Sequence, residues 1–171
     1  MPQIKIREWN EKPRTKLRFI KIGDIFCYQF SEEMFVFGQI LGKVNVGHVI
    51  QFFDIFQASP TITVEELSRA QFMGKPIIVD SYTLFDRSPV WSWQIIGHQV
   101  DFDLSPFMNL AFKWGDPNGL HFGKVWLDGR REPKIFSREE VEDLDWEACV
   151  GSIVYNRILE EELASRGNKG V

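Results

Sequence analysis

The segment from Phe19 to Phe56 decides the fold, and it reads FIKIGDIFCYQFSEEMFVFGQILGKVNVGHVIQFFDIF. Gly23-Asp24 is a predicted corner that leads into a strand over Ile25–Phe30. Met34–Leu41 and His48–Phe56 follow, with apolar residues at both odd and even positions, as in strands covered on two faces. Because the connections are short, we expect these three strands to pair as an antiparallel meander.

A change of hydrophobic parity marks the segment Trp91–Leu104. Its clearest apolar residues lie at odd positions before Gly97 and at even positions after it. Since side chains alternate between the two faces of a strand, one face stays buried across this change only if one residue is inserted. The segment therefore predicts a bulged, sharply bent strand, with the bulge at Gly97.

Helices are indicated by two capping boxes and one apolar stripe. We expect the helix of the first capping box to stop near Gly74, and the helix of the tail to start at Gly151 or Ser152 and to end just before Gly167. The two capping boxes and the stripe consist of Thr63 and Glu66, of Ser137 and Glu140, and of Tyr155, Ile158, Leu159 and Leu163.

We expect an α+β, mostly β fold in one domain, residues 1–171: a bent antiparallel sheet with the C-terminal helix packed on it. The parts are a basic leader (1–18), a β-rich core (19–150) and a C-terminal helix with its tail (151–171). Further strands are predicted over Pro76–Asp80, Leu110–Trp114 and Phe122–Leu127.

Charge is unevenly distributed along the chain. Residues 1–21 hold seven Lys or Arg against two Glu, a net +5, so that the remainder carries −9 of the total charge of −4. An acidic body repels nucleic acid and anionic lipid and attracts basic partners. We interpret the basic leader as a solvated sheet edge that deters pairing with other chains.

The cellular compartment follows from what the sequence lacks. The first residues contain no apolar targeting segment, and no run of about 18 apolar residues is long enough to span a bilayer. We therefore expect a cytoplasmic protein. Cys27 and Cys149 lie in apolar surroundings far apart in the sequence, which predicts two reduced core thiols.

Catalytic and metal-binding patterns are scarce. His48, His98 and His121 lack the spacing of metal ligands, and we interpret them as structural or surface residues. On a strand, Asp101 and Asp103 would project from one face about 7 Å apart, as an acid/base pair or a metal site requires. The same positions also suit the polar face of an amphipathic strand, which is the interpretation we prefer. We predict no enzyme, no catalytic residue, no metal and no cofactor.

The central segments resemble the immunity protein 26 family of bacterial polymorphic-toxin systems. The resemblance rests on the Gly-Asp corner at Gly23, on the aromatic-Gly-x-aliphatic strand around Gly38, and on Val49–Ile55. It continues through Trp93–Gly97 and through Gly151 at the start of the last helix. A Gly-Asp-aliphatic corner also opens SH3-like barrels, so the meander resembles that fold as well.

The family resemblance implies a mostly β protein that binds and neutralises a cognate toxin domain, as in toxin–antitoxin and contact-dependent inhibition systems. We expect one copy to bind one toxin and to cover a functional surface, with no nucleic acid, membrane or small-molecule substrate involved. Because basic clefts are common in toxins that cleave nucleic acids, exposed carboxylates are the candidate contacts. These are Asp101, Asp103, Asp128, Glu139, Glu140 and Glu142.

Two other functions remain open from the sequence. One is an SH3-like protein- or RNA-binding module that uses the basic leader and exposed aromatic residues. The other is a hydrolase with Asp101 and Asp103 at its centre.

Overall fold

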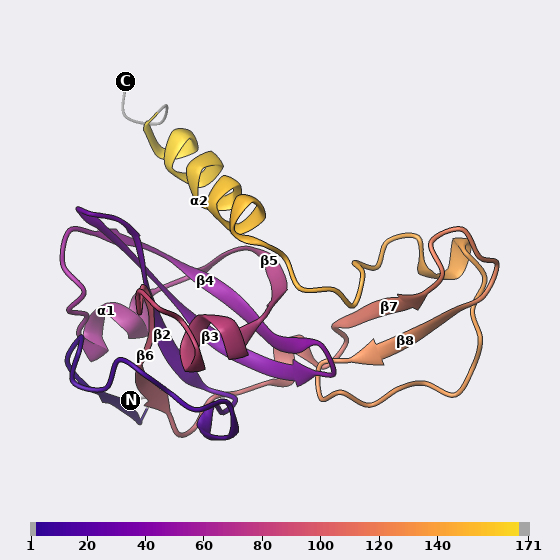
Figure 1. Ribbon diagram of the computed structural model, residues 1–171, viewed down its shortest axis with the longest axis horizontal. Helices are drawn as coiled ribbons and strands as arrows, with labels where there is room; N and C mark the ends of the chain where they lie inside the picture. The colour runs from indigo at the N-terminus through magenta and orange to yellow at the C-terminus, as the bar shows by residue number, and fades with distance from the viewer. Residues whose placement is uncertain (1–2, 168–171) are drawn as a thin grey trace.

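The computed structural model describes residues 3–167 and contains a six-stranded antiparallel sheet in the order β1-β6-β2-β3-β4-β5 (Figure 1). Strands β2 to β4 form the predicted three-stranded meander, β5 adds a fourth strand beside β4, and β6 returns to pair with β2. The strands are β1 (Ile4–Ile6), β2 (Asp24–Ser31), β3 (Met34–Val44), β4 (Gly47–Gln57), β5 (Phe72–Val79) and β6 (Trp93–Gln99). The prediction of a mostly β, antiparallel fold is confirmed.

Both faces of the sheet are covered, as the apolar residues at both parities predict. On one face, Phe26, Ile50 and Trp93 belong to a buried cluster that also includes residues of the C-terminal helix. On the other face, Phe37 and Phe53 pack with residues of the short first helix and of the leader. The sheet is therefore the centre of the molecule.

Tight approach of the strands explains the glycine in the centre of β3. A Cβ atom at Gly38 would collide with the ring of Phe26 and with the backbone carbonyl of Gln51. At the corner before β2, Gly23 has a φ of +86°, and Asp24 accepts a hydrogen bond from the Lys21 amide at 2.8 Å. Of the two glycines that carry the family resemblance, Gly38 allows the strands to approach closely and Gly23 allows the chain to turn into β2.

The bulge at Gly97 is confirmed. Ile25 pairs with Gly97 and Phe26 pairs with Ile95, so Ile96 is the inserted residue and its side chain joins the opposite buried cluster.

The prediction that this strand continues to Leu104 is wrong. β6 ends at Gln99, and the chain turns where the Val100 amide donates to the Gln3 carbonyl and the Gln3 amide donates to Asp101 Oδ1. Strand β1 pairs with β6 only over Gly97 to Gln99, so no strand forms backbone pairing with the chain directly after Gln99.

Strands β7 (Ala111–Gly115) and β8 (Phe122–Trp126) form a separate antiparallel pair, close to their predicted bounds. They lie to the right of the main sheet in Figure 1, and we call residues 111–147 the lobe. A buried cluster that contains Leu41 and Val49 of the main sheet and Phe112 and Val125 of the lobe joins the two parts.

The two α-helices are α1 (Val64–Arg69) and α2 (Ser152–Gly167). The predicted capping box of α1 is present, but its predicted end near Gly74 is wrong. The Asp54 amide donates to the Gln71 carbonyl, which brings the chain into β5 directly after the helix. Shorter helical turns span Leu17–Phe19, Tyr82–Asp86, Ser105–Phe107 and Glu139–Val141.

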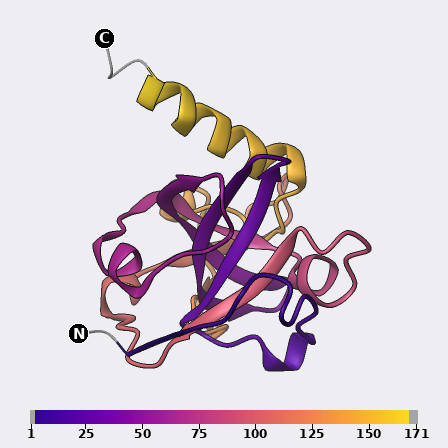
Figure 2. The same ribbon diagram turned by 90° about the vertical axis from the view of Figure 1, so that its left-hand side faces the viewer.

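The predicted C-terminal helix is confirmed, and Figure 2 shows it above the sheet. Gly151 lies directly before its first residue, and its carbonyl accepts from the amides of Val154 and Tyr155. Tyr155 and Leu159 are buried in the cluster around Trp93. The apolar stripe therefore attaches the first half of α2 to the sheet.

The two cysteines differ. Cys27 is buried and unpaired on β2, as predicted. Cys149 is exposed, and its thiol donates to the Val46 carbonyl at 3.0 Å, so the prediction of a core thiol is wrong for it. It lies on the connector between the lobe and α2, where its apolar sequence neighbours do not form a strand of the core.

Candidate functional site

Residues 102–108, which follow β6, border two recesses in the surface. The first recess has a volume of about 40 Å³ and the second about 210 Å³. We name them the Met108 recess and the Gln39 recess. Ile22, Leu104, Met108, Trp126, Leu127, Asp128 and Arg130 line the first; Ile4, Ile25, Gln39, Phe53, Leu67, Ala70, Phe72, Gln99, Phe102 and Asp103 line the second.

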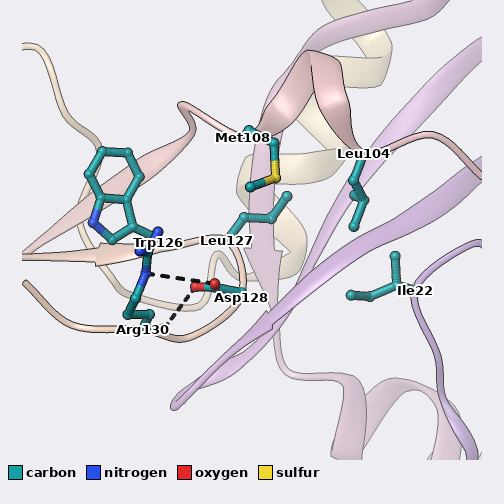
Figure 3. A pocket seen from close by; sticks show the side chains of 7 residues that line it. All are labelled: Ile22, Leu104, Met108, Trp126, Leu127, Asp128 and Arg130. Atoms are coloured by element: carbon teal, nitrogen blue, oxygen red, sulfur yellow. Dashed lines mark hydrogen bonds and ion pairs between the residues drawn. The ribbon is translucent and has the colours of Figure 1, made fainter.

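The Met108 recess combines exposed apolar side chains with a charged rim. Met108 is 57% exposed and Ile22 is 40% exposed, which is unusual for residues of this type. Figure 3 shows Met108, Leu104 and Ile22 on one side of Leu127, with Trp126 and Arg130 on the other. An apolar side chain of another protein inserted here would be desolvated by residues from three segments of the chain.

Asp128 forms the acidic part of this rim. Its Oδ1 accepts from the Arg130 amide at 3.0 Å, and its Oδ2 lies 3.7 Å from Arg130 Nε. Both side chains are more than half exposed, so this ion pair is weak and open to exchange with a partner's charge.

Asp103 is the acidic residue of the Gln39 recess, as Asp128 is of the Met108 recess. It accepts hydrogen bonds from the amide and the hydroxyl of Ser105, at 2.8 and 2.7 Å. The hydrogen bond from the Ser105 hydroxyl has the larger effect and the bond from the amide the smaller one, and both lower the pKa of Asp103. Its carboxylate is therefore ionised at neutral pH.

The structure brings only two of the six predicted contact residues to these recesses, namely Asp103 and Asp128. Asp101 binds the Gln3 amide in the turn after β6 and does not share a strand face with Asp103. The arrangement expected for an acid/base pair on one strand is therefore absent from this segment.

The three glutamates lie on the lobe, away from both linings. Glu139 and Glu140 belong to the turn Glu139–Val141, and Glu142 follows it. Glu140 pairs with Lys134 at 2.7 Å and caps the turn through the Ser137 amide. This capping box is the one that the sequence predicts.

Sequence reasoning missed the apolar residues of both recesses. Ile22 and Met108 stand in irregular segments without periodicity, and Gln39 lies in an otherwise apolar strand where its pattern indicates only a buried position. The Asp128-Gly129 turn directly after Trp126 and Leu127 was the one available signal for an acidic group beside apolar side chains.

Two of the three histidines form contacts within the fold, and the third is exposed. His48 is buried on β4, and its Nδ1 lies 2.5 Å from Ser81 Oγ. His98 Nδ1 lies 2.8 Å from Asp24 Oδ1, beside the corner before β2. His121 is exposed in the loop between β7 and β8. Across residues 3–167 we find no group of three or more His, Cys, Asp or Glu side chains arranged to hold a metal ion.

The burial of His48 predicts how the stability of the protein depends on pH. Burial, and then the charge of Lys43, lowers its pKa from 6.5 to about 4. An unfolded chain binds this proton at a higher pH, so the stabilisation is complete above about pH 6.5 and is lost as the pH falls toward 4. The loss is expected to be about 3 kcal/mol.

Urea unfolding at pH 7 and at pH 4.5 of the natural protein and of His48→Gln measures this effect. The variant is expected to lose less stability than the natural protein between the two pH values. Equal losses in the two proteins would contradict the role given to His48.

The basic leader is part of the fold. Arg14 pairs with Asp86 at 2.7 Å, and the Thr15 amide donates to the Phe85 carbonyl. Strand β1 forms one edge of the sheet. The leader therefore offers fewer free cations to RNA than its composition indicates. Within the described part of the chain, no helix is long and apolar enough to cross a membrane.

The fold and these recesses define a β-sheet protein with surfaces suited to side chains of another protein. The family model for immunity protein 26 matches residues 21–115, which include β2 to β7. The chain therefore belongs to the immunity protein 26 family, and this membership gives it a function in immunity. No curated protein matches the chain, and no solved structure does.

Proposed function

We propose that this immunity protein binds a cognate bacterial toxin domain in the cytoplasm, one copy to one toxin, and silences it by covering a functional surface. The observation that supports this most directly is the pair of recesses beside residues 102–108, because each joins apolar side chains to a carboxylate at its rim. No catalytic step is assigned to the chain.

The Met108 recess is the proposed anchor site. Binding energy in protein interfaces is concentrated in a few side chains that become fully desolvated near the centre. Met108 is flexible and exposed, and with Leu104 and Ile22 it can adapt to an inserted apolar side chain. The rate of dissociation should depend mainly on these contacts.

The carboxylates are proposed to act at longer range. Outside residues 1–21 the chain carries a net charge of −9, so a basic toxin surface is attracted before contact. Asp103 and Asp128 stand at the recesses, while Asp101, Glu139, Glu140 and Glu142 extend the acidic surface. The rate of association should therefore fall with rising salt.

Two variants separate these roles. Met108→Ala is expected to speed dissociation about tenfold with an unchanged association rate, because it removes an anchor. Asp128→Lys is expected to slow association severalfold at low salt, and less at high salt. Ile153→Ala and Glu160→Lys on α2 are matched controls, since both residues are exposed and line neither recess.

Surface plasmon resonance with the toxin domain encoded beside this gene measures both rates. Equal effects of Met108→Ala and Ile153→Ala would exclude the Met108 recess from the interface. An association rate that does not change with salt concentration would exclude electrostatic steering. It would not contradict the role of the Met108 recess as the anchor site.

A further inference from the structure

The lining of the Gln39 recess includes one side-chain acceptor that lacks a donor. Gln39 is only 1% exposed, and its Nε2 donates to the Gly23 carbonyl at 3.3 Å and to Gln99 Oε1 at 3.1 Å. Its Oε1 receives no hydrogen bond from any residue that the structure describes. A buried amide oxygen in this condition favours a ligand that brings a donor.

A second acceptor lies on the neighbouring strand. Gln51 pairs with Gln39 across β3 and β4, so the two side chains project from the same face of the sheet. Gln51 Nε2 donates to the Gly74 carbonyl at 2.6 Å, while its Oε1 is buried and without a partner among residues 3–167. Gln51 does not line the Gln39 recess, however, so Gln39 Oε1 is the amide oxygen without a donor that the recess offers to a ligand.

The walls around Gln39 are mainly apolar, include three phenylalanines and carry no positive charge. The rings of Phe53 and Phe72 are stacked with centroids 4.9 Å apart, and Phe102 borders the same recess. Asp103 is the one ionisable residue in the lining. The faces of aromatic rings attract cations, and the carboxylate adds to this attraction.

We propose that the Gln39 recess binds the guanidinium group of an arginine side chain that the toxin domain supplies. A guanidinium group carries five donors in a planar fork, stacks on aromatic rings and pairs with carboxylates, and these properties match the Gln39 amide oxygen, the phenylalanines and Asp103. A volume of about 210 Å³ exceeds the roughly 30 Å³ that one water molecule occupies in the liquid, so the recess has room for such a group.

This assignment of the partner's chemistry rests on the proposed function, but its test needs no toxin. The probe is N-acetyl-arginine N-methylamide, added to the isotope-labelled protein and followed by NMR. The side-chain amide signals of Gln39 are expected to shift in a saturable manner, with a dissociation constant in the millimolar range. The citrulline analogue, which has nearly the same shape and no charge, is expected to bind at least tenfold more weakly.

A pair of aspartates gives matched variants. Asp103→Asn should weaken arginine binding at least threefold, and Asn retains an oxygen for the Ser105 contacts. Asp101→Asn should leave binding unchanged, because Asp101 is two residues away and does not line the recess. Both positions are exposed, so neither variant is expected to unfold the protein.

The outcomes separate this inference from the proposed function. Equal binding of arginine and citrulline probes, absence of shifts at Gln39, or equal effects of the two aspartate variants would overturn the arginine site. Those results would leave toxin binding through the Met108 recess untouched. Conversely, specific arginine binding in a protein that binds no toxin would reject the proposed function alone.

Discussion

Replacing Trp93 with alanine is expected to lower the free energy of unfolding by about 3–5 kcal/mol, the usual range for truncating a fully buried large aromatic residue. Trp93 begins β6 and is almost completely buried. Its ring stacks on Tyr28 with centroids 4.4 Å apart and on Phe26 at 5.2 Å, and it meets Tyr155 of α2 edge to face. The truncation therefore leaves a cavity where the sheet and the C-terminal helix meet.

Urea unfolding followed by circular dichroism measures this loss. Phe19→Ala is a suitable control, because Phe19 is an aromatic residue that is about half exposed. It is expected to cost about 1 kcal/mol or less. If the two variants lost similar stability, Trp93 would not be the centre of the core.

Replacing Arg131 with methionine is expected to cost about 3–5 kcal/mol, because it leaves a buried carboxylate without its countercharge. Arg131 Nη2 lies 2.7 Å from Glu147 Oε2, and the Glu147 side chain is only 3% exposed. With the Asn45 amide oriented so that its oxygen faces Arg131, that oxygen accepts from Nη2 at 2.9 Å. The guanidinium group also lies 4.6 Å from the centre of the Trp114 ring.

These contacts join the β3–β4 turn to the lobe, and Glu147 is the last residue of the lobe before the connector to α2. Glu147→Gln should cost less than Arg131→Met, because Arg131 is 36% exposed and can be solvated when its partner is neutral. The double variant Arg131→Met with Glu147→Leu should regain much of the loss, since no charge then remains buried. Denaturant midpoints of the three variants test this order, and a double variant less stable than Arg131→Met would contradict it.

The central sheet could be predicted because its signals are local. Short connections and apolar residues at both parities between Phe19 and Phe56 allow little except a meander covered on two faces. The change of hydrophobic parity at Gly97 likewise indicates the bulge, which appears as a register shift in the pairing of β6 with β2. Both capping boxes appear as hydrogen bonds within four residues, so the sequence contains all their partners.

The errors arose where distant pairing decides the structure. The turn at Asp101 depends on how far β1 extends beside β6, and β1 lies almost a hundred residues earlier. The early end of α1 depends on Asp54 of β4. Cys149 has apolar sequence neighbours but lies on a connector at the surface.

The candidate site could be predicted only in part. Negative charge selected Asp103 and Asp128, which the structure places beside recesses, and for the same reason it selected Asp101 and the three glutamates, which line neither recess. Each recess joins segments that lie far apart in the sequence; Ile22 and Met108, for example, are 86 residues apart. No local sequence pattern indicates where such distant segments meet, so Met108 and Gln39 could be identified only from the structure.

The central claim is that this chain neutralises a toxin domain by binding it one to one. The most direct measurement is to titrate the purified chain into a fixed amount of its proposed cognate toxin domain and to follow the toxin's activity. We predict a linear loss of activity that reaches completion at one equivalent, together with a complex of matching mass in size-exclusion chromatography. Undiminished toxin activity at several equivalents, with no complex in the column, would contradict the account.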